Sequence, residues 1–193
     1  MYGIYLGRFQ PFHKGHLKTD KIAKSQYGIE DSLFVIFNYT PFIPSYSFPF
    51  SKKEQEEMVR ALGINTVFFD INLESGYLRH LLPHNFLKKW MELRRIGGKN
   101  EKRYITRDRT EFVILSFLFL HPLYIPFGKD ERVFRSSNIK KLICEGRIEE
   151  VIEMIPENRE YRRKFLEIVK NKDWKKIPRS GYEIFGLKIP PRI

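Results

Sequence analysis

The sequence predicts an α/β protein with a Rossmann-like fold: a parallel five-stranded sheet with helices on both faces and a helical C-terminal appendage. Short runs of β-branched and aromatic residues alternate along the chain with helical stretches, and this order is typical of a buried parallel sheet. The 193 residues are 42% apolar, which is enough for one sizeable core. No internal repeat, low-complexity tract or long linker points to another architecture.

Five runs are predicted strands because they are short and rich in β-branched or aromatic residues. They cover residues 2–6, 32–38, 66–71, 103–106 and 123–126. The stretches between and after them have near-helical spacing of apolar residues. These predicted helices cover residues 14–27, 51–62, 85–95, 110–120, 137–144, 148–155 and 157–170. We therefore expect one α/β domain over residues 1–156 and a basic helical extension over 157–193, packed on the same domain.

The apolar run at residues 112–127 needs a separate explanation. It contains His121, Pro122 and Pro126 and falls short of the roughly 20 clean residues of a membrane helix. A buried helix followed by a buried strand is the expectation, with no membrane partner. The start of the chain has no pattern of a signal peptide, and its single cysteine, Cys144, cannot form an internal disulfide. A cytoplasmic location and no cysteine metal site are therefore expected.

The formal net charge of +12 is large and is compatible with polyphosphate, nucleic-acid or anionic-membrane partners. Much of the excess lies in the C-terminal extension, with Trp174 and Tyr182 interleaved. Its basic residues are Arg159, Arg162, Arg163, Lys164, Lys170, Lys172, Lys175, Lys176 and Arg179. Such a run could hold nucleic acid through phosphate contacts and stacking, but charge runs are usually solvated helix faces. We expect small-molecule substrates and leave nucleic acid as the lesser alternative.

The most informative segment runs from Gly7 to His16 and reads Gly-Arg-Phe-Gln-Pro-Phe-His-Lys-Gly-His; we call it the signature segment. It connects the first predicted strand to the first predicted helix, at the sheet edge where open α/β sheets bind ligands. Backbone amides and the helix dipole favour an anion at a helix N-terminus, and imidazole and guanidinium groups add donors. His13 and His16 are three residues apart, so both can face one point on a first helical turn. Gly15 lets a ligand approach closely. A histidine pair alone could equally be a capped helix start or a stray metal site.

The signature segment resembles that of the nucleotidyltransferase group of α/β proteins, with its His-x-Gly-His pattern. Its Arg-Phe-Gln-Pro form is most similar to archaeal-type nicotinamide-nucleotide adenylyltransferases. Residues 48–58 resemble the Asn-Pro-Phe-Thr stretch of that family and the following helix, with Phe48 at the asparagine position and Gln55 where arginine is usual. Residues 136–143 resemble the start of its second phosphate-binding helix, with Lys140 at an arginine position. Lysine keeps the charge but lacks the planar fork that grips a phosphate through two bonds.

The resemblance implies roles for individual residues. His16 would contact the α-phosphate in the transition state, His13 the triphosphate, and Arg8 a phosphate, and these three form the expected catalytic group. Residues expected to bind ATP and its phosphates are Gly7, Phe9, Gly15, Ser136, Ser137 and Lys140. Taken alone, Ser136 could also be an ordinary N-cap. Magnesium is expected to arrive with the nucleotide, because it keeps most of its waters and needs few protein ligands.

The second substrate is less visible in the sequence. In the resembled family an aromatic residue after the third strand stacks on the nicotinamide ring, and Trp90 lies in about that place, although a tryptophan on an amphipathic helix is usually core. Asp70, at the end of the third predicted strand, could accept a hydrogen bond from an amide or ribose, or serve as an N-cap or turn residue. Residues 106–109 follow the fourth strand, where ribose and adenine would lie, and surface ion pairing explains them almost as well.

The function implied by the resemblance is transfer of an adenylyl group from ATP to nicotinamide mononucleotide (NMN), giving NAD and pyrophosphate. One alternative is adenylyl or cytidylyl transfer to another phosphate acceptor, such as pantetheine phosphate. A second is a non-catalytic protein that binds nucleotides or nucleic acid, which the departures at Phe48, Gln55 and Lys140 would favour. A homo-oligomer is possible.

Overall fold

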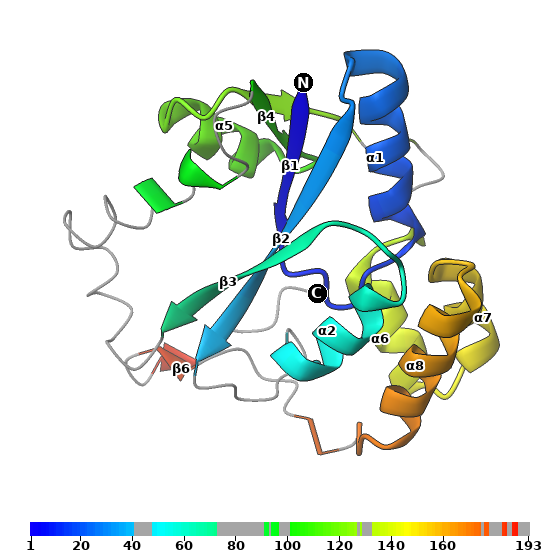
Figure 1. Cartoon of the computed structure of the whole chain (residues 1–193). Coiled ribbons are helices and arrows are strands. Elements are labelled where there is room, and N and C mark those ends of the chain that lie inside the picture. The colour runs from blue at the N-terminus through cyan, green and yellow to red at the C-terminus, as the bar shows by residue number, and fades with distance from the viewer. Residues whose placement is uncertain are drawn as a thin grey trace. The chain divides into compact units, whose positions relative to one another are not determined.

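The structure is a computed structural model that describes residues 1–40, 48–72, 91–92, 94–96, 101–126, 128, 133–174, 176–177, 183–184 and 187–188 (Figure 1). The chain divides into two compact units. Unit 1 comprises residues 1–7, 18–41 and 65–128, and unit 2 comprises residues 8–17, 42–64 and 129–193.

Unit 1 is built on a five-stranded sheet, as predicted. The strands are β1 (Tyr2–Gly7), β2 (Asp31–Thr40), β3 (Thr66–Asn72), β4 (Lys102–Thr106) and β5 (Pro122–Tyr124). They pair in the order β3-β2-β1-β4-β5, and every pairing is parallel. This is the Rossmann-like order, with β1 at the centre and the chain moving outward to either side. The prediction of the fold class is confirmed.

Two of the helices that connect neighbouring strands lie on opposite faces of the sheet. Helix α1 (Lys14–Tyr27) connects β1 to β2, and α5 (Arg109–Phe117) connects β4 to β5. The two crossovers move in opposite directions along the sheet, and right-handed connections then place their helices on opposite faces (Figure 1). The bounds of α1 coincide with the predicted ones. Its first four residues belong to unit 2 and the rest to unit 1.

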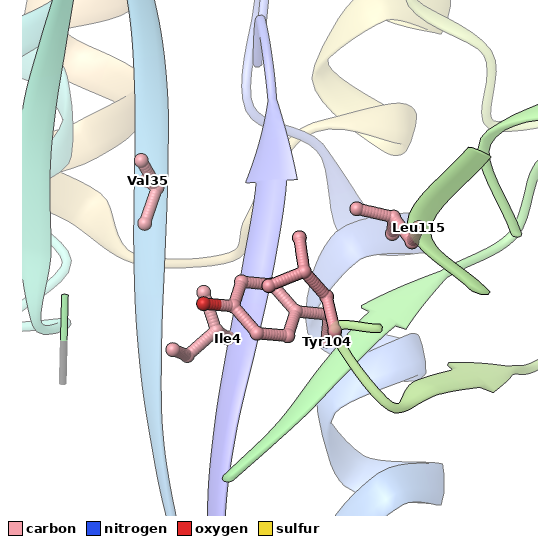
Figure 2. Packing of buried hydrophobic residues seen from close by; sticks show 5 residues of the cluster. Ile4, Val35, Tyr104 and Leu115 are labelled. Atoms are coloured by element: carbon pink, nitrogen blue, oxygen red, sulfur yellow. The ribbon is translucent and has the colours of Figure 1, made fainter. Parts of the chain in front are cut away.

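The core of unit 1 lies where the central strands meet α5. Figure 2 shows Ile4 of β1, Val35 of β2, Tyr104 of β4 and Leu115 of α5 in this cluster, which also contains Leu120. All five are almost fully buried. The ring of Tyr5 stacks on that of Phe34, its register partner across the strand pair, with centroids 4.6 Å apart. Burial of these side chains is the main contribution to the stability of the sheet.

The apolar run at residues 112–127 forms a helix and a strand, as predicted, but the expectation that the helix is buried is wrong in part. Leu115 is buried, whereas Val113, Phe117 and Phe119 are 63%, 82% and 78% exposed. Five of the nine residues of α5 are apolar, and four of them are consecutive, at residues 112–115. Consecutive residues point to different sides of a helix, and only one stripe of a helix can face a sheet. Among the described residues, no helix combines the length and apolar character needed to cross a membrane.

Unit 2 contains the helices α2 (Lys52–Arg60), α6 (Ser136–Cys144), α7 (Ile148–Met154) and α8 (Arg159–Lys170). The side chains of Ser51 and Glu54 form a reciprocal capping box at the start of α2. The side chain of Asn158 caps α8 by accepting from the backbone N–H of Tyr161 at 2.9 Å. Helix α8 packs against α2.

The C-terminal part differs from expectation in one detail. Beyond α8 the structure has a small antiparallel pair, β6 (Glu183–Ile184) and β7 (Leu187–Lys188), that was not predicted. Of the predicted helix at residues 85–95, only four residues near its end are described, and they are helical. The division of the chain into a domain over 1–156 and an extension over 157–193 stays a prediction.

Candidate functional site

The signature segment leaves β1 through an unusual backbone. Phe9 has a φ of 48°, in the left-handed region that bulky residues rarely adopt. The next peptide bond, between Gln10 and Pro11, is cis. Phe9 and Phe12 are buried, and their ring centroids lie 4.8 and 4.9 Å from that of His16. A positive φ at a bulky residue persists where the surroundings hold it, and here the two phenyl rings pack against the imidazole of His16.

His13 and His16 lie together at the start of α1, as the spacing predicts. Their rings stack with centroids 3.7 Å apart and an interplanar angle of 23°. The backbone N–H of His13 donates to Nδ1 of His16 at 3.1 Å. A neutral imidazole that accepts at Nδ1 carries its proton on Nε2. This hydrogen bond therefore makes the Nε2–H of His16 a donor.

Gly15 is surrounded closely. A Cβ atom at this position would lie 3.0 Å from both Cε1 and Nδ1 of His13, and 3.1 Å from Cβ of Phe134. Real Cβ atoms rarely come so close to other atoms, so a side chain here would push the His13 ring or the Phe134 segment away. The glycine thus lets the first turn of α1 approach the segment that leads into α6.

The start of α6 lies against the signature segment. The hydroxyl of Ser136 donates to the carbonyl oxygen of Pro11 at 3.3 Å. Ser136 is the first residue of α6 and Arg135 is its N-cap, without a side-chain cap hydrogen bond, so the alternative of Ser136 as N-cap is wrong. Ser137 follows and is exposed. Unit 2 thus brings the histidines and the α6 helix start together, and both elements are suited to anions.

The signature segment and α6 each contribute one cationic side chain, Arg8 and Lys140. Lys140, one turn into α6, is only 6% exposed, and Arg8 is exposed. Burial, and then the positive charge of Arg8, lower the pKa of Lys140 to about 8. The guanidinium carbon of Arg8 lies 5.3 Å from the centroid of the Phe48 ring. This cation–π contact occurs at the position where the resembled family has asparagine.

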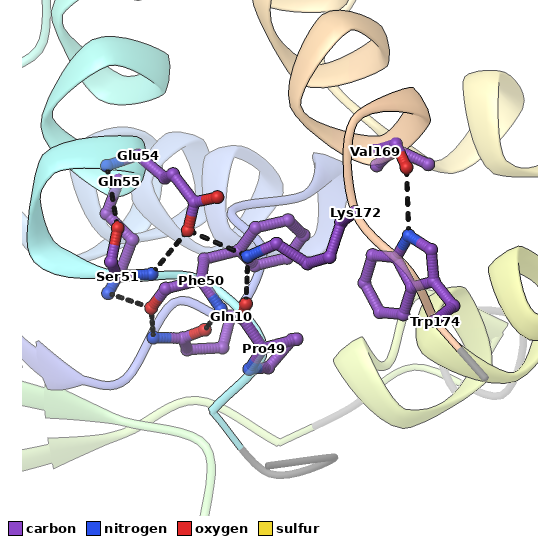
Figure 3. Close-up of polar contacts among 9 residues, drawn as sticks. All are labelled: Gln10, Pro49, Phe50, Ser51, Glu54, Gln55, Val169, Lys172 and Trp174. Atoms are coloured by element: carbon purple, nitrogen blue, oxygen red, sulfur yellow. Dashed lines mark hydrogen bonds and ion pairs between the residues drawn. The ribbon is translucent and has the colours of Figure 1, made fainter. Parts of the chain in front are cut away.

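The Pro49–Ser51 turn is fastened to the signature segment by a pair of hydrogen bonds (Figure 3). The Gln10 amide donates to the Phe50 carbonyl at 2.9 Å and accepts from the Phe50 backbone N–H at 3.0 Å. Gln55, where arginine is usual, is buried and donates to the same carbonyl at 3.4 Å. Both glutamines bond to the backbone of this turn and so help to hold it beside the signature segment.

Lys172, just after α8, also contacts the Pro49–Ser51 turn (Figure 3). Its ammonium group donates to the Pro49 carbonyl, pairs with Glu54 at 2.8 Å and lies 5.2 Å from the Phe50 ring centroid. Trp174 packs edge-on against Phe50, with centroids 5.8 Å apart, and donates to the Val169 carbonyl. The segment after α8, which the family resemblance left without a role, therefore supports the turn beside the signature segment.

Several basic residues of the C-terminal extension are engaged within unit 2. Arg163 and Lys164 pair with Glu167, and Lys176 pairs with Asp173. Arg162 donates to the carbonyl groups of Ile152 and Pro156. Three of the basic side chains of the extension therefore pair with nearby carboxylates, and a fourth binds backbone carbonyls.

The remaining predicted site residues belong to unit 1 or lie outside the described residues. Gly7 ends β1, and Asp70 lies on β3 opposite Asn38 of β2, both in unit 1. The buried Asn38 amide donates to Oδ1 of Asp70 at 2.7 Å, so Asp70 is held by a side-chain partner that sequence reasoning did not identify. Trp90 lies outside the described residues. Within the described part of the chain, no three His, Cys, Asp or Glu side chains gather to hold a metal ion.

Comparison with known proteins decides the family. The profile of the Cytidylyltransferase-like family matches residues 4–180, which is most of the chain. The chain belongs to this family. Its membership and fold agree with the nucleotidyltransferase superfamily predicted from the signature segment, while the archaeal-type subfamily stays a prediction. No curated protein matches the sequence.

Solved structures show the same fold at low identity. A bifunctional NMN adenylyltransferase/ADP ribose pyrophosphatase from Francisella tularensis, complexed with AMP and Mn ion, matches with a TM-score of 0.58 and 18% identity. The match covers 88% of this chain and 51% of that one. The NadR protein in complex with NAD and AMP-PNP matches with a TM-score of 0.55 and 18% identity, covering 85% and 46%. The chain thus spans about half the length of these proteins.

The Lys172 contacts predict a measurable contribution to stability. Lys172→Met should lower the free energy of unfolding by about 1–3 kcal/mol, because it removes the side-chain donor to the Pro49 carbonyl and the cationic partner of Glu54. Chemical denaturation followed by circular dichroism measures this change. Lys176→Met is the matched control, since its side chain is 86% exposed and its ion pair lies at the surface; we expect a change within about 0.5 kcal/mol. Equal effects of the two variants would contradict the assignment.

Proposed function

We propose that this protein transfers an adenylyl group from ATP to nicotinamide mononucleotide, forming NAD and pyrophosphate. The observation that carries the proposal is the fixed donor of His16. Its Nδ1 is occupied by the His13 backbone N–H, which leaves Nε2–H to donate to an anion beside the start of α6. A donor held in place before substrate binds is suited to charge that develops in a transition state.

The chemistry needs alignment and charge but no covalent nucleophile. A phosphate oxygen of the acceptor attacks the α-phosphorus of ATP in line. A new P–O bond forms while the bond between the α-phosphorus and the bridging oxygen to the β-phosphate breaks, and pyrophosphate leaves with the electron pair. His16 would donate to the α-phosphate oxygens, whose negative charge the reaction must accommodate. His13, stacked on His16, would contact the triphosphate.

The β- and γ-phosphates would lie at the start of α6. Ser136, Ser137 and Lys140 would bind them, with Arg8 as a second cation, and Gly15 and Phe9 would shape the approach. Lys140 and Arg8 raise the local positive charge, and an anion between them would relieve their mutual repulsion. The proposal thus explains why a lysine is kept buried near another cation at this place.

A divalent metal ion would come with the nucleotide rather than sit in a protein cage. The described residues do not offer three clustered ligands of the usual kinds, and Mg²⁺ is commonly bound through phosphates and water. When bound, it would neutralise charge on the phosphates. The F. tularensis protein is complexed with both AMP and Mn ion, which supports the use of a divalent cation.

The choice of NMN as acceptor rests on the Arg-Phe-Gln-Pro form of the signature segment. Two of the similar solved proteins add support, since one is an NMN adenylyltransferase and the other is in complex with NAD. Asp70, held by Asn38, would accept from the acceptor's amide or ribose, and Trp90 would stack on its ring. Adenylyl or cytidylyl transfer to another phosphate acceptor, such as pantetheine phosphate, is the second candidate, and the name of the family profile supports cytidylyl as the group transferred.

A nucleic-acid function receives less support. Arg163, Lys164 and Lys176 form ion pairs with nearby carboxylates, which makes these side chains less available to a phosphate backbone. A homo-oligomer and a cytoplasmic location stay predictions.

The direct test is incubation of the purified chain with MgATP and NMN, with pantetheine phosphate in a parallel reaction. We expect NAD and pyrophosphate in equal amounts, detected by chromatography and a coupled pyrophosphate assay. His16→Ala should lower turnover by about a hundredfold or more, as for the loss of one transition-state donor. Lys21→Ala, an exposed change on the same helix, is the control. A product from pantetheine phosphate but none from NMN would reverse the order of the two acceptors, and wild-type turnover in His16→Ala would contradict its role.

The pKa of Lys140 predicts a pH dependence for ATP use. The ammonium form binds phosphate, and it loses its proton as the pH rises through about 8, so kcat/KM for ATP should fall above that pH. Lys140→Arg should remove this fall between pH 7 and 9.5, because a guanidinium stays charged. Lys141→Arg, an exposed neighbour, should keep it. A profile of Lys140→Arg that matches the wild type would show that another group titrates.

A further inference from the structure

Tyr161 of α8 reaches the signature segment from 149 positions further along the chain. Its side chain is fully buried, and its hydroxyl donates to the carbonyl oxygen of Phe12 at 2.7 Å. Burial raises the pKa of this phenol above its usual range, so the hydroxyl keeps its proton and remains a donor at any physiological pH. None of the roles described above for the phosphate site uses this residue.

The bond matters because of which peptide group it meets. The Phe12 carbonyl and the His13 N–H are the two ends of one planar peptide. One end accepts from Tyr161, and the other donates to Nδ1 of His16 at 3.1 Å. The three groups therefore form a chain of hydrogen bonds: phenol, peptide, imidazole. A donor at the carbonyl polarises the peptide and strengthens its N–H as a donor, and it also resists rotation of the peptide plane.

We propose that Tyr161 is a positioning residue that orients the His16 imidazole and fixes its Nε2–H tautomer through the Phe12–His13 peptide. The proposal rests on the proposed role of His16 as the donor to the α-phosphate. It gives the C-terminal helix a part in catalysis that does not require contact with substrate.

The start of α8 is held beside the signature segment by contacts other than the Tyr161 hydroxyl. The Asn158 side chain caps α8 by bonding to the Tyr161 backbone, and the Phe165 ring lies nearly parallel to that of Tyr161, with centroids 6.3 Å apart. One turn before, Glu157 pairs with Lys14, which lies between the two histidines in sequence, at 2.8 Å. The start of α8 is thus tied to the signature segment at two points, one buried and one exposed.

A purely structural role is the competing explanation, because a buried tyrosine also fills space. The two explanations predict different effects on the His16 tautomer when only the Tyr161 hydroxyl is removed. Tyr161→Phe keeps the ring and removes the donor. If Tyr161 only fills space, this variant leaves His16 as it was. If the hydrogen-bonded chain orients His16, the Phe12–His13 peptide rotates more freely in Tyr161→Phe. A larger fraction of the neutral His16 rings then carries the proton on Nδ1.

The experiment measures His16 directly and turnover separately. Imidazole ¹⁵N shifts of full-length protein report the tautomer at a pH where the ring is neutral, without substrate. Steady-state assays with MgATP and NMN report kcat and KM. Two controls accompany Tyr161→Phe. Tyr104→Phe removes another buried phenol hydroxyl, from β4. Phe165→Leu loosens α8 but keeps the Tyr161 hydroxyl.

We expect Tyr161→Phe to shift the tautomer toward Nδ1–H and to lower kcat about tenfold to a hundredfold, as for a misplaced catalytic group, with KM for ATP changed less than about threefold. The two controls should leave the tautomer unchanged. An unaltered tautomer with kcat within about twofold of the wild type overturns the proposal, as does an equal tautomer shift in Phe165→Leu. Absence of NAD formation by the wild type would refute the proposed function instead, and the NMR measurement would still decide the role of Tyr161 toward His16.

Discussion

The hydrogen bond from the His13 backbone N–H to Nδ1 of His16 is the contact on which the site depends. It settles which nitrogen of His16 carries the proton, and so turns a flexible side chain into a donor with a defined direction. Around it, Phe9 and Phe12 enclose the ring, Gly15 permits close packing, and Ser136 ties α6 to the same segment. A polyphosphate bound here would meet donors whose orientation is already fixed before it arrives, which is the condition for efficient transition-state stabilisation.

The departures from the resembled family make sense as local replacements. Phe48 replaces an asparagine and holds Arg8 through its ring. Gln55 replaces an arginine and, buried, donates to the Phe50 carbonyl. Lys140 replaces an arginine, keeps a charge at the start of α6, and makes that charge depend on pH near 8. The second and third changes exchange a permanent charge for a neutral or titratable group, so the site depends more on hydrogen bonds and on the two histidines.

The sequence predicted what local patterns determine. The strand positions, the bounds of α1 and the juxtaposition of His13 with His16 follow from periodicity and spacing, because these are properties of neighbouring residues. Contacts between distant residues were not predictable. Nothing near Tyr161 in the sequence indicates that its hydroxyl meets Phe12, and nothing near Gln10 indicates that its amide pairs with the Phe50 backbone 40 residues away. The exposed apolar residues of α5 were missed for a related reason, since a run of four consecutive apolar residues does not reveal which stripe of the helix meets the sheet.

The central claim is that the signature segment and the start of α6 bind one polyphosphate, with His16 at its α-phosphate. A crystal structure with α,β-methylene-ATP tests it most directly, because this analogue cannot release pyrophosphate. The account predicts an α-phosphate oxygen within hydrogen-bond distance of His16 Nε2, and the outer phosphates beside Ser136 and Lys140. A triphosphate bound away from α6, or an α-phosphate that His16 Nε2 does not face, would contradict it.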